Sequence, residues 1–248
     1  MTNQELYALL RQRLQELLRE HHLTAETVTI TAKGLTAEEA IGNPERKDYP
    51  ILTGSEVMLM ARFRNGRGQA FTDAPAQFSG SLQEILDGDI EHDPYTRAMF
   101  IAALNAVMAE LGLACPSVHC RNKGPQECAG HVVEWVKTNH PHSRIAMVGY
   151  QPAMASALAK EFEIRVLDLN PENIGQHREG FTVLDGNTQR EVVIDWADLV
   201  LCTGSTICNG TLINFLDLPK PTVFFGTTLS GAAPLLGLQR LCFADVVG

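Results

Sequence analysis

The sequence from Ile145 to Asn170, IAMVGYQPAMASALAKEFEIRVLDLN, contains two short apolar runs separated by a helical segment. Ile145–Val148 and Ile164–Leu169 each have the length of a buried strand, and the turn at Gly149 leads directly into the helix between them. Three further runs of strand length follow, at Leu199–Cys202, Val223–Phe225 and Leu241–Val247. Strands that alternate with helices predict a parallel sheet with right-handed crossovers. We therefore expect a Rossmann-like domain over residues 141–248.

The first 140 residues have a different pattern, of short strands that follow one another. The runs at 27–31, 55–63 and 69–72 have the composition of strands, and Asn65-Gly66 is a common hairpin turn. The loop at 41–52 is rich in proline, glycine and charge. These signals predict a small antiparallel meander.

Helices are expected to cover this meander. Thr2 and Glu5 have the spacing of a capping box, and leucines then recur at helical spacing as far as Leu18. Further helices are predicted at 82–86, after Asp93-Pro94 and after Gly124-Pro125, where proline stands at the first helical position. The fold class is therefore α/β, with a small α+β domain over residues 1–140 and the Rossmann-like domain after it.

Composition excludes several classes of protein. The net charge is −9, so the positive footprint that nucleic acid binding requires is missing. No apolar stretch approaches the ~20 residues of a membrane span, and the polar N-terminus is unlike a signal peptide. Without an export signal, the six cysteines are expected to be free thiols or metal ligands. We expect a cytoplasmic protein, and a homodimer, because a three-stranded meander rarely buries both faces alone.

Small and polar residues gather after the predicted parallel strands, whose carboxyl ends share one edge of the sheet. Asp168 lies 19 residues after Gly149 in the sequence, which is the separation at which an acidic residue of a dinucleotide-binding fold meets a ribose hydroxyl. However, GYQPAM contains one glycine where the dinucleotide fingerprint has three. The alternative is an aspartate that caps the next loop. The turns at 203–206 and 226–228 suit either anion binding or ordinary helix capping. The predicted ligand-binding residues here are Gly149, Gln151, Asp168, Asn170, Thr203, Gly204, Ser205, Thr206, Asn209, Gly226, Thr227 and Thr228.

The first domain offers a second set of polar residues in its loops. Asn43 and Arg46 lie in the first long loop, and Thr72 and Asp73 end the meander. If the first domain folds over the second, these residues would face the same crevice. Otherwise they are ordinary loop residues.

Histidine and cysteine occur together at His119, Cys120, Cys128 and His131. Both are common ligands of zinc-like ions, so these four residues are candidate metal ligands for a divalent cation. Cys128 and His131 share one face of a helix, whereas the side chains of adjacent His119 and Cys120 diverge. At most three ligands can therefore converge, as in an open site. The alternative is that the thiols only pack in the core.

Several motifs together resemble one known family. They are GNPERKDYPIL at 42–52, GQAFTDAP at 68–75, FIAALNAV at 100–107, SVHC at 117–120, GPQECA at 124–129, GYQPAM at 149–154, DLNPENIG at 168–175, TGSTICNGT at 203–211 and FFGTTLSGAAPLLG at 224–237. In combination they are similar to the "putative heavy-metal chelation" family over about residues 30–243. The resemblance implies an enolase-N-terminal-like first domain, a Rossmann-like second domain and a ligand site between them.

Two functional hypotheses follow. In the first, the protein binds a metal ion or a metal-chelating small molecule in the cleft between the domains. In the second, it is an enzyme that acts on a small anionic or nucleotide-like substrate in the Rossmann-like crevice. The sequence names neither the ligand nor a reaction.

Overall fold

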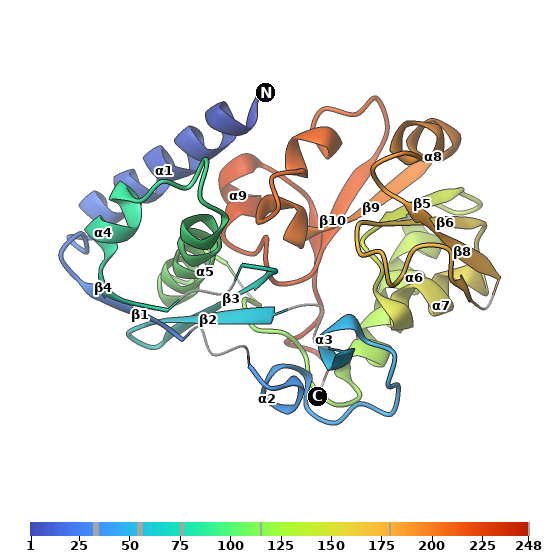
Figure 1. Ribbon diagram of the computed structural model, residues 1–248, viewed down its shortest axis with the longest axis horizontal. Coiled ribbons are helices and arrows are strands. Elements are labelled where there is room, and N and C mark those ends of the chain that lie inside the picture. The colour runs from blue at the N-terminus through green and yellow to red at the C-terminus, as the bar shows by residue number, and fades with distance from the viewer. Residues whose placement is uncertain (32–34, 54–56, 75–76, 115, 179, 248) are drawn as a thin grey trace.

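The chain is built on two β-sheets, which lie apart in Figure 1 with the smaller at lower left and the larger at right. This computed structural model describes residues 1–31, 35–53, 57–74, 77–114, 116–178 and 180–247. We refer to residues 1–140 as the N-terminal region and to the rest as the C-terminal region. The mixed α/β class is confirmed; the enolase-like and Rossmann-like names and the division at residue 140 stay predictions.

The small sheet is antiparallel and has the order β3-β2-β1-β4. Its strands are β1 (Thr27–Thr31), β2 (Val57–Phe63), β3 (Gly66–Thr72) and β4 (Phe78–Ser81). Phe63 pairs with Gly66 across the hairpin, and Arg64 has a positive φ of 51°. The turn residues are thus Arg64 and Asn65, one position before the predicted Asn65-Gly66. β4 was not predicted, because FSGS has no strand-like alternation. Residues 55 and 56 of the predicted strand 55–63 lie outside the described residues.

Helices α1 (Asn3–Glu20), α4 (Leu82–Asp87) and α5 (Pro94–Glu110) accompany this sheet, and Figure 1 shows α5 between it and α1. The capping box of Thr2 and Glu5 is present. α5 is buried on almost every side, with eleven of its 17 residues buried. The short helix α2 (Ala37–Ile41) precedes the predicted loop 41–52, and α3 (Pro50–Thr53) lies at the end of that loop.

The close approach of α5 to the sheet depends on glycine in β3. A Cβ atom at Gly68 would lie 2.2 Å from the backbone nitrogen of Ala106 and 2.4 Å from the carbonyl oxygen of Ala102. Only a residue without a side chain allows the helix and the strand to cross at this distance. α5 therefore packs closely on the N-terminal sheet, and its other sides contact the C-terminal region.

The large sheet has the order β11-β10-β9-β5-β6-β8-β7, and every pair is parallel except β7–β8. Its four predicted inner strands are β5 (Ile145–Val148), β6 (Ile164–Asp168), β9 (Leu199–Thr203) and β10 (Thr222–Phe225). The structure adds β7 (His177–Arg178) and β8 (Phe181–Asp185), and β11 is only Arg240–Leu241. The predicted strand at 241–247 therefore ends at its first residue.

Both faces of the large sheet are covered, as expected for parallel strands. In β9, Val200 and Cys202 belong to one apolar cluster, whereas Leu199 and Leu201 belong to the other. Helices α6 (Gly124–Asn139) and α7 (Pro152–Ala159) pack against each other, and α8 (Arg190–Trp196) contacts β5 and β6. The remaining elements are the 3-10 turns η1 (Gly204–Ile207) and η2 (Leu212–Phe215) and helix α9 (Ala232–Leu236).

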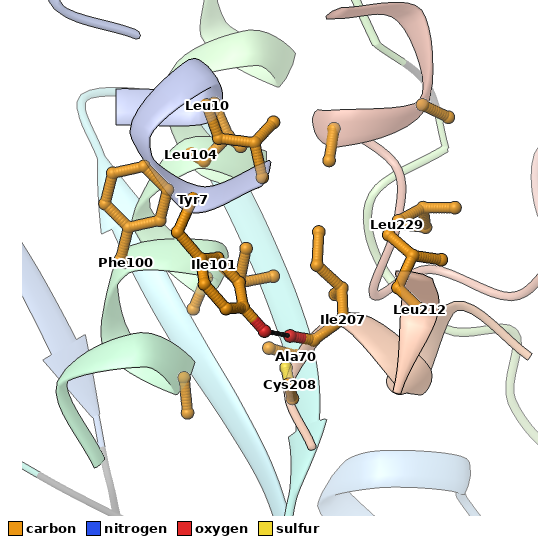
Figure 2. Close-up of a cluster of buried hydrophobic side chains, with 14 of the residues drawn as sticks. Tyr7, Leu10, Ala70, Phe100, Ile101, Leu104, Ile207, Cys208, Leu212 and Leu229 are labelled. Atoms are coloured by element: carbon orange, nitrogen blue, oxygen red, sulfur yellow. Dashed lines mark hydrogen bonds between the residues drawn. The ribbon is translucent and has the colours of Figure 1, made fainter. Parts of the chain in front are cut away.

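Both apolar clusters contain residues of the two regions, and the first of them joins α1 and α5 to η1, η2 and α9. Figure 2 shows its centre, where the Tyr7 hydroxyl donates a hydrogen bond of 2.7 Å to the carbonyl oxygen of Ile207. Burial raises the pKa of Tyr7 to about 12. Among the described residues, no helix combines the length and the apolar character needed to cross a bilayer. The cytoplasmic location and the homodimer stay predictions.

Candidate functional site

A cavity of about 570 Å³ lies at the carboxyl ends of β5, β6, β9 and β10. Side chains of the N-terminal region, including Tyr49, Phe71 and His119, form part of its wall. All the predicted ligand-binding residues line it except Asn43 and Arg46. Those that do are Thr72, Asp73, Gly149, Gln151, Asp168, Asn170, Thr203, Gly204, Ser205, Thr206, Asn209, Gly226, Thr227 and Thr228. The structure thus brings these residues together at one edge of the sheet, and ligand binding by them stays a prediction.

Two glycines shape this edge. Gly149 and Gly226 follow β5 and β10 with positive φ values of 85° and 89°, a conformation that side chains disfavour. A Cβ atom at Gly149 would also lie 2.5 Å from the Thr203 methyl carbon. The turn after β5 can therefore approach the turn after β9 closely, and one glycine suffices for this contact.

Asp168 closes the turns beside it. Its carboxylate accepts hydrogen bonds of 2.7 Å from the backbone N–H groups of Tyr150 and Asn170. The side chain is half-buried and lines the cavity. The loop-capping role considered from the sequence is therefore present, and contact with a ribose stays a prediction. Carboxylate oxygens have several acceptor sites, so these bonds leave room for a ligand donor.

The hydroxyl-rich turn after β9 also satisfies its own backbone. Thr203 Oγ1 accepts from the Ser205 N–H at 3.4 Å, and Thr206 Oγ1 donates to the Thr203 carbonyl oxygen at 2.8 Å. Capping is thus observed here, while anion binding stays a prediction.

Two other hydroxyls in the cavity wall lack partners. Tyr49 Oη and Thr227 Oγ1 are buried and make no hydrogen bond within the part of the chain that the structure describes. Tyr49 is 5% exposed and Thr227 is 2% exposed. Burial raises the pKa of Tyr49 to about 12, so its hydroxyl is protonated and can donate. They come from the two different regions of the chain.

His119 also lines this wall of the cavity. Its backbone N–H donates to Gln69 Oε1 at 2.6 Å, and its Nδ1 lies 2.6 Å from the Cys120 carbonyl oxygen. Because a carbonyl only accepts, Nδ1 carries the proton and Nε2 is left as an acceptor. Burial lowers the pKa of His119, which favours this neutral form. The ring meets Phe71 edge-on, with centroids 5.6 Å apart.

Asn43 and Arg46 have other partners. Arg46 forms a two-pronged ion pair with Asp48, with N–O distances of 2.6 and 3.0 Å. The Asn43 side-chain oxygen accepts from Lys47 Nζ at 2.7 Å. The predicted position of these two residues in the crevice is not what the structure shows, because the loop uses them to fold on itself.

The four candidate metal ligands do not gather around one point. His119 lines the cavity, whereas Cys120 and Cys128 are half-buried and are not part of its lining. His131 is exposed and stacks on Phe243, with centroids 5.2 Å apart. Among the described residues, no group of three or more histidine, cysteine, aspartate or glutamate side chains could hold a metal ion. Cys115 lies outside the described residues.

Asn105 joins the N-terminal region to the cavity wall. This fully buried side chain lies on α5. Its Nδ2 donates to the carbonyl oxygens of Gln69 at 2.8 Å and Thr228 at 2.9 Å, and its Oδ1 accepts from the Gly231 N–H at 2.7 Å. It therefore fixes the loop after β10 against β3.

Comparison with models of known protein families gives one match. Residues 132–237 match the model of the family described as "putative heavy-metal chelation" (DUF364). This segment, which is less than half of the chain, is similar to that family. The resemblance inferred from the motifs is therefore confirmed there. A search of curated proteins finds no significant match.

Two solved structures of the family are similar to this chain. One, from Pyrococcus horikoshii, is 18% identical with a TM-score of 0.53, and the match covers 90% of this chain and 79% of that one. The other, from Desulfitobacterium hafniense, is 18% identical with a TM-score of 0.49, and covers 78% of each chain. Both are described as proteins of unknown function. The first likeness supports the fold of the family beyond residues 132–237.

Sequence reasoning missed Tyr49 and Phe71, which line the cavity, and Asn105, which holds part of its wall. Tyr49 and Phe71 lie in stretches whose motifs were recognised, but nothing in their spacing shows that they reach the other region. Asn105 had a signal, since an amide within the apolar segment FIAALNAV is unusual. A buried amide needs partners, and this one finds them across the two regions.

Proposed function

We propose that the chain binds a small, acceptor-rich organic molecule of the metal-chelating kind in this cavity. The observation that carries the proposal is the pair of buried, unpartnered hydroxyls of Tyr49 and Thr227 in its wall. A buried polar group without a partner costs about 1–3 kcal/mol. Both residues line the cavity of about 570 Å³, and a bound ligand with oxygen acceptors would give both hydroxyls a partner.

The size and chemistry of the cavity favour a molecule over a bare ion. Its volume lies within the roughly 300–1,000 Å³ of small-molecule sites. Apolar surfaces such as those of Phe71 and Phe225 line it beside the polar turns. The described residues offer no cluster that could hold an ion alone, so any metal would arrive with its organic chelator.

The test uses untagged, purified protein. Mass spectrometry of the denatured protein identifies any retained small molecule, and elemental analysis before and after dialysis measures metal. Citrate, a chelating carboxylate, serves as the calorimetric probe alongside any retained molecule. Tyr49→Phe and Thr227→Val should each weaken binding about threefold to tenfold, since one hydrogen bond contributes roughly 0.5–1.5 kcal/mol. Tyr95→Phe, at a half-exposed tyrosine on α5, is the matched control.

The outcomes are distinct. A retained organic molecule, or probe binding weakened only by the cavity variants, supports the proposal. Stoichiometric metal that stays bound to molecule-free protein would overturn it in favour of a direct metal site. Equal binding by all three variants would also overturn it.

A second function is supported by His119. A neutral imidazole whose tautomer is fixed by a carbonyl leaves Nε2 able to accept a proton from a molecule in the cavity. This arrangement favours an enzyme that acts on a small anionic or nucleotide-like substrate. His119→Gln would then abolish turnover of the retained molecule while leaving its affinity within about threefold. Unchanged turnover would refute this role.

A further inference from the structure

The cavity extends well beyond the hydroxyls on which the proposed function depends. Its wall includes the turn after β10 at one end and the turn after β8 at the other, and Figure 1 shows these two strands on opposite sides of the large sheet. Neighbouring strands lie about 4.8 Å apart, so the four steps from β10 to β8 span about 19 Å. A molecule the size of citrate that contacts Thr227 therefore leaves the end at β8 unoccupied.

The order of the strands divides the cavity into two halves. Along the chain, the sheet grows from β5 through β6 to β8 in one direction, and then from β9 through β10 to β11 in the other. Open parallel sheets bind ligands at the carboxyl ends of their strands, beside the point where this direction changes. The half formed by β5, β6 and β8 therefore offers a separate place for a ligand.

Three residues at the β8 end have the chemistry that recognises a flat heterocycle. Leu169 lines the cavity and is 41% exposed, although it is a large apolar side chain. Asn187 provides an amide donor and acceptor, and Arg190 provides a planar guanidinium that can stack on a ring. Arg190 is the only lysine or arginine among the described residues that line the cavity. These side chains suit a nucleobase.

Asp168 lies between these residues and the turn after β5. Its carboxylate is half-buried, lines the cavity and keeps acceptor capacity beyond the two backbone N–H groups that it already bonds. A Cβ atom at Gly186 would lie 3.2 Å from the Asp168 carbonyl oxygen, so the turns after β6 and β8 approach each other closely. A carboxylate in this position can accept hydrogen bonds from ribose hydroxyls.

The turn after β5 does not suit a phosphate. The Gly149 N–H donates to the Leu167 carbonyl oxygen at 2.8 Å, the Tyr150 N–H donates to Asp168 at 2.7 Å, and Pro152 has no N–H. Turns that bind phosphate direct several N–H groups at the anion instead. The Asp168 carboxylate would also repel a phosphate close to it. The chemistry of this half therefore favours a nucleoside over a nucleotide.

We propose that the cavity has a second site, at the carboxyl ends of β5, β6 and β8, which binds a nucleoside that carries no phosphate. Asp168 accepts from the ribose hydroxyls, Asn187 bonds to the edge of the base, and Leu169 and Arg190 cover its faces. The inference goes beyond the proposed function, because it concerns the other end of the cavity and a second molecule.

The test is calorimetry of the dialysed full chain with adenosine, guanosine, cytidine and uridine as probes. At least one should bind, and its 2′-deoxy form should bind about tenfold more weakly or worse, because a hydrogen bond to a carboxylate is lost. Its 5′-monophosphate should bind no more tightly than the nucleoside. The proposal is overturned if none of the four binds, if the deoxy form binds equally well, or if the monophosphate binds more tightly.

Substitutions locate the site. Asp168→Asn should weaken nucleoside binding about tenfold and reduce the preference for ribose. The matched control is Asp185→Asn, because Asp185 pairs with Asp168 in register, caps its own turn through the Asn187 N–H at 2.8 Å and does not line the cavity. Equal effects of these two substitutions would overturn the assignment. Arg190→Gln, which should weaken binding about threefold or more, replaces Asp168→Asn if circular dichroism shows that this variant does not fold.

The second site and the proposed function can fail separately. Tyr49→Phe and Thr227→Val should leave nucleoside affinity within about twofold. Loss of nucleoside binding in these two variants would overturn the second site, because a single ligand would then fill the whole cavity. Citrate binding that both variants leave unchanged would overturn the proposed function alone.

Discussion

Replacement of Asn105 by alanine should separate the two regions more than any other single polar deletion. Asn105 is 0% exposed, and its amide makes hydrogen bonds of 2.7, 2.8 and 2.9 Å to Gly231, Gln69 and Thr228. Each bond contributes about 1 kcal/mol net, and the buried backbone groups left without a partner add to the loss. We expect Asn105→Ala to lower the free energy of unfolding by about 3–5 kcal/mol, out of roughly 5–15 kcal/mol for a typical protein.

Urea unfolding, followed by circular dichroism, measures this change. The matched control is Asn139→Ala, at an exposed asparagine of α6 whose amide donates to the Trp135 carbonyl oxygen within the same helix. That substitution should change the free energy of unfolding by no more than about 0.5 kcal/mol. A loss of less than about 1 kcal/mol in Asn105→Ala would show that the amide does not hold the regions together.

The other predictions concern packing, a buried hydroxyl and an ion pair. Gly68→Ala should lower the free energy of unfolding by about 3 kcal/mol, because the new methyl group would meet the backbone of α5. The control Gly130→Ala, at a position of α6 with open space around it, should raise the free energy of unfolding by about 0.5–1 kcal/mol. Equal effects of the two substitutions in thermal unfolding would refute the close contact between Gly68 and α5. Tyr7→Phe should cost about 1–2 kcal/mol, since the carbonyl partner of its hydroxyl is buried, and an unchanged urea midpoint would contradict this. The Arg144 guanidinium holds the pKa of the Asp198 carboxyl well below its usual range, so the stability from this pair is present above about pH 4 and is lost as the pH falls further. Asp198→Asn should therefore be less stable than the unsubstituted protein at pH 7, and the difference should shrink as the pH falls below about 4. A difference that stays constant between about pH 7 and about pH 2 would refute the assignment.

The sequence predicted those parts of the fold that depend on local pattern. Apolar runs such as Ile145–Val148 identify buried parallel strands, and the turns after them had to share an edge. β8 was missed because Phe181–Asp185 lies at the margin of the sheet, where its half-buried residues give no continuous apolar run. β4 was missed for a related reason, since its pairing with β1 rather than its composition makes it a strand.

The lining of the cavity was predicted more completely for the C-terminal region than for the N-terminal region, where Thr72 and Asp73 were named. The strand-end turns are local features, so residues such as Asp168 and Thr227 could be named in advance. The packing of α5 determines which residues of the N-terminal region face these turns. Sequence pattern does not predict this packing, because it depends on contacts between residues that are distant in the sequence. Tyr49 was therefore missed, whereas Arg46, from the same loop, was predicted to face the crevice but pairs with Asp48.

The packing of α5 against the loop after β10 connects the stability of the folded chain with ligand binding in the cavity. Thr227 and Thr228 line the cavity, and Asn105 holds the loop that contains them. A ligand that accepts from both Tyr49 and Thr227 would join the two regions a second time, and would stabilise the folded chain by about 2.7 kcal/mol at a concentration of 100 times its Kd. In Asn105→Ala the ligand must also order the loop, so part of its binding free energy is used for that purpose. The ligand should therefore bind this variant more weakly, although Asn105 does not itself line the cavity, and unchanged affinity would mean that the loop after β10 keeps its position without the amide.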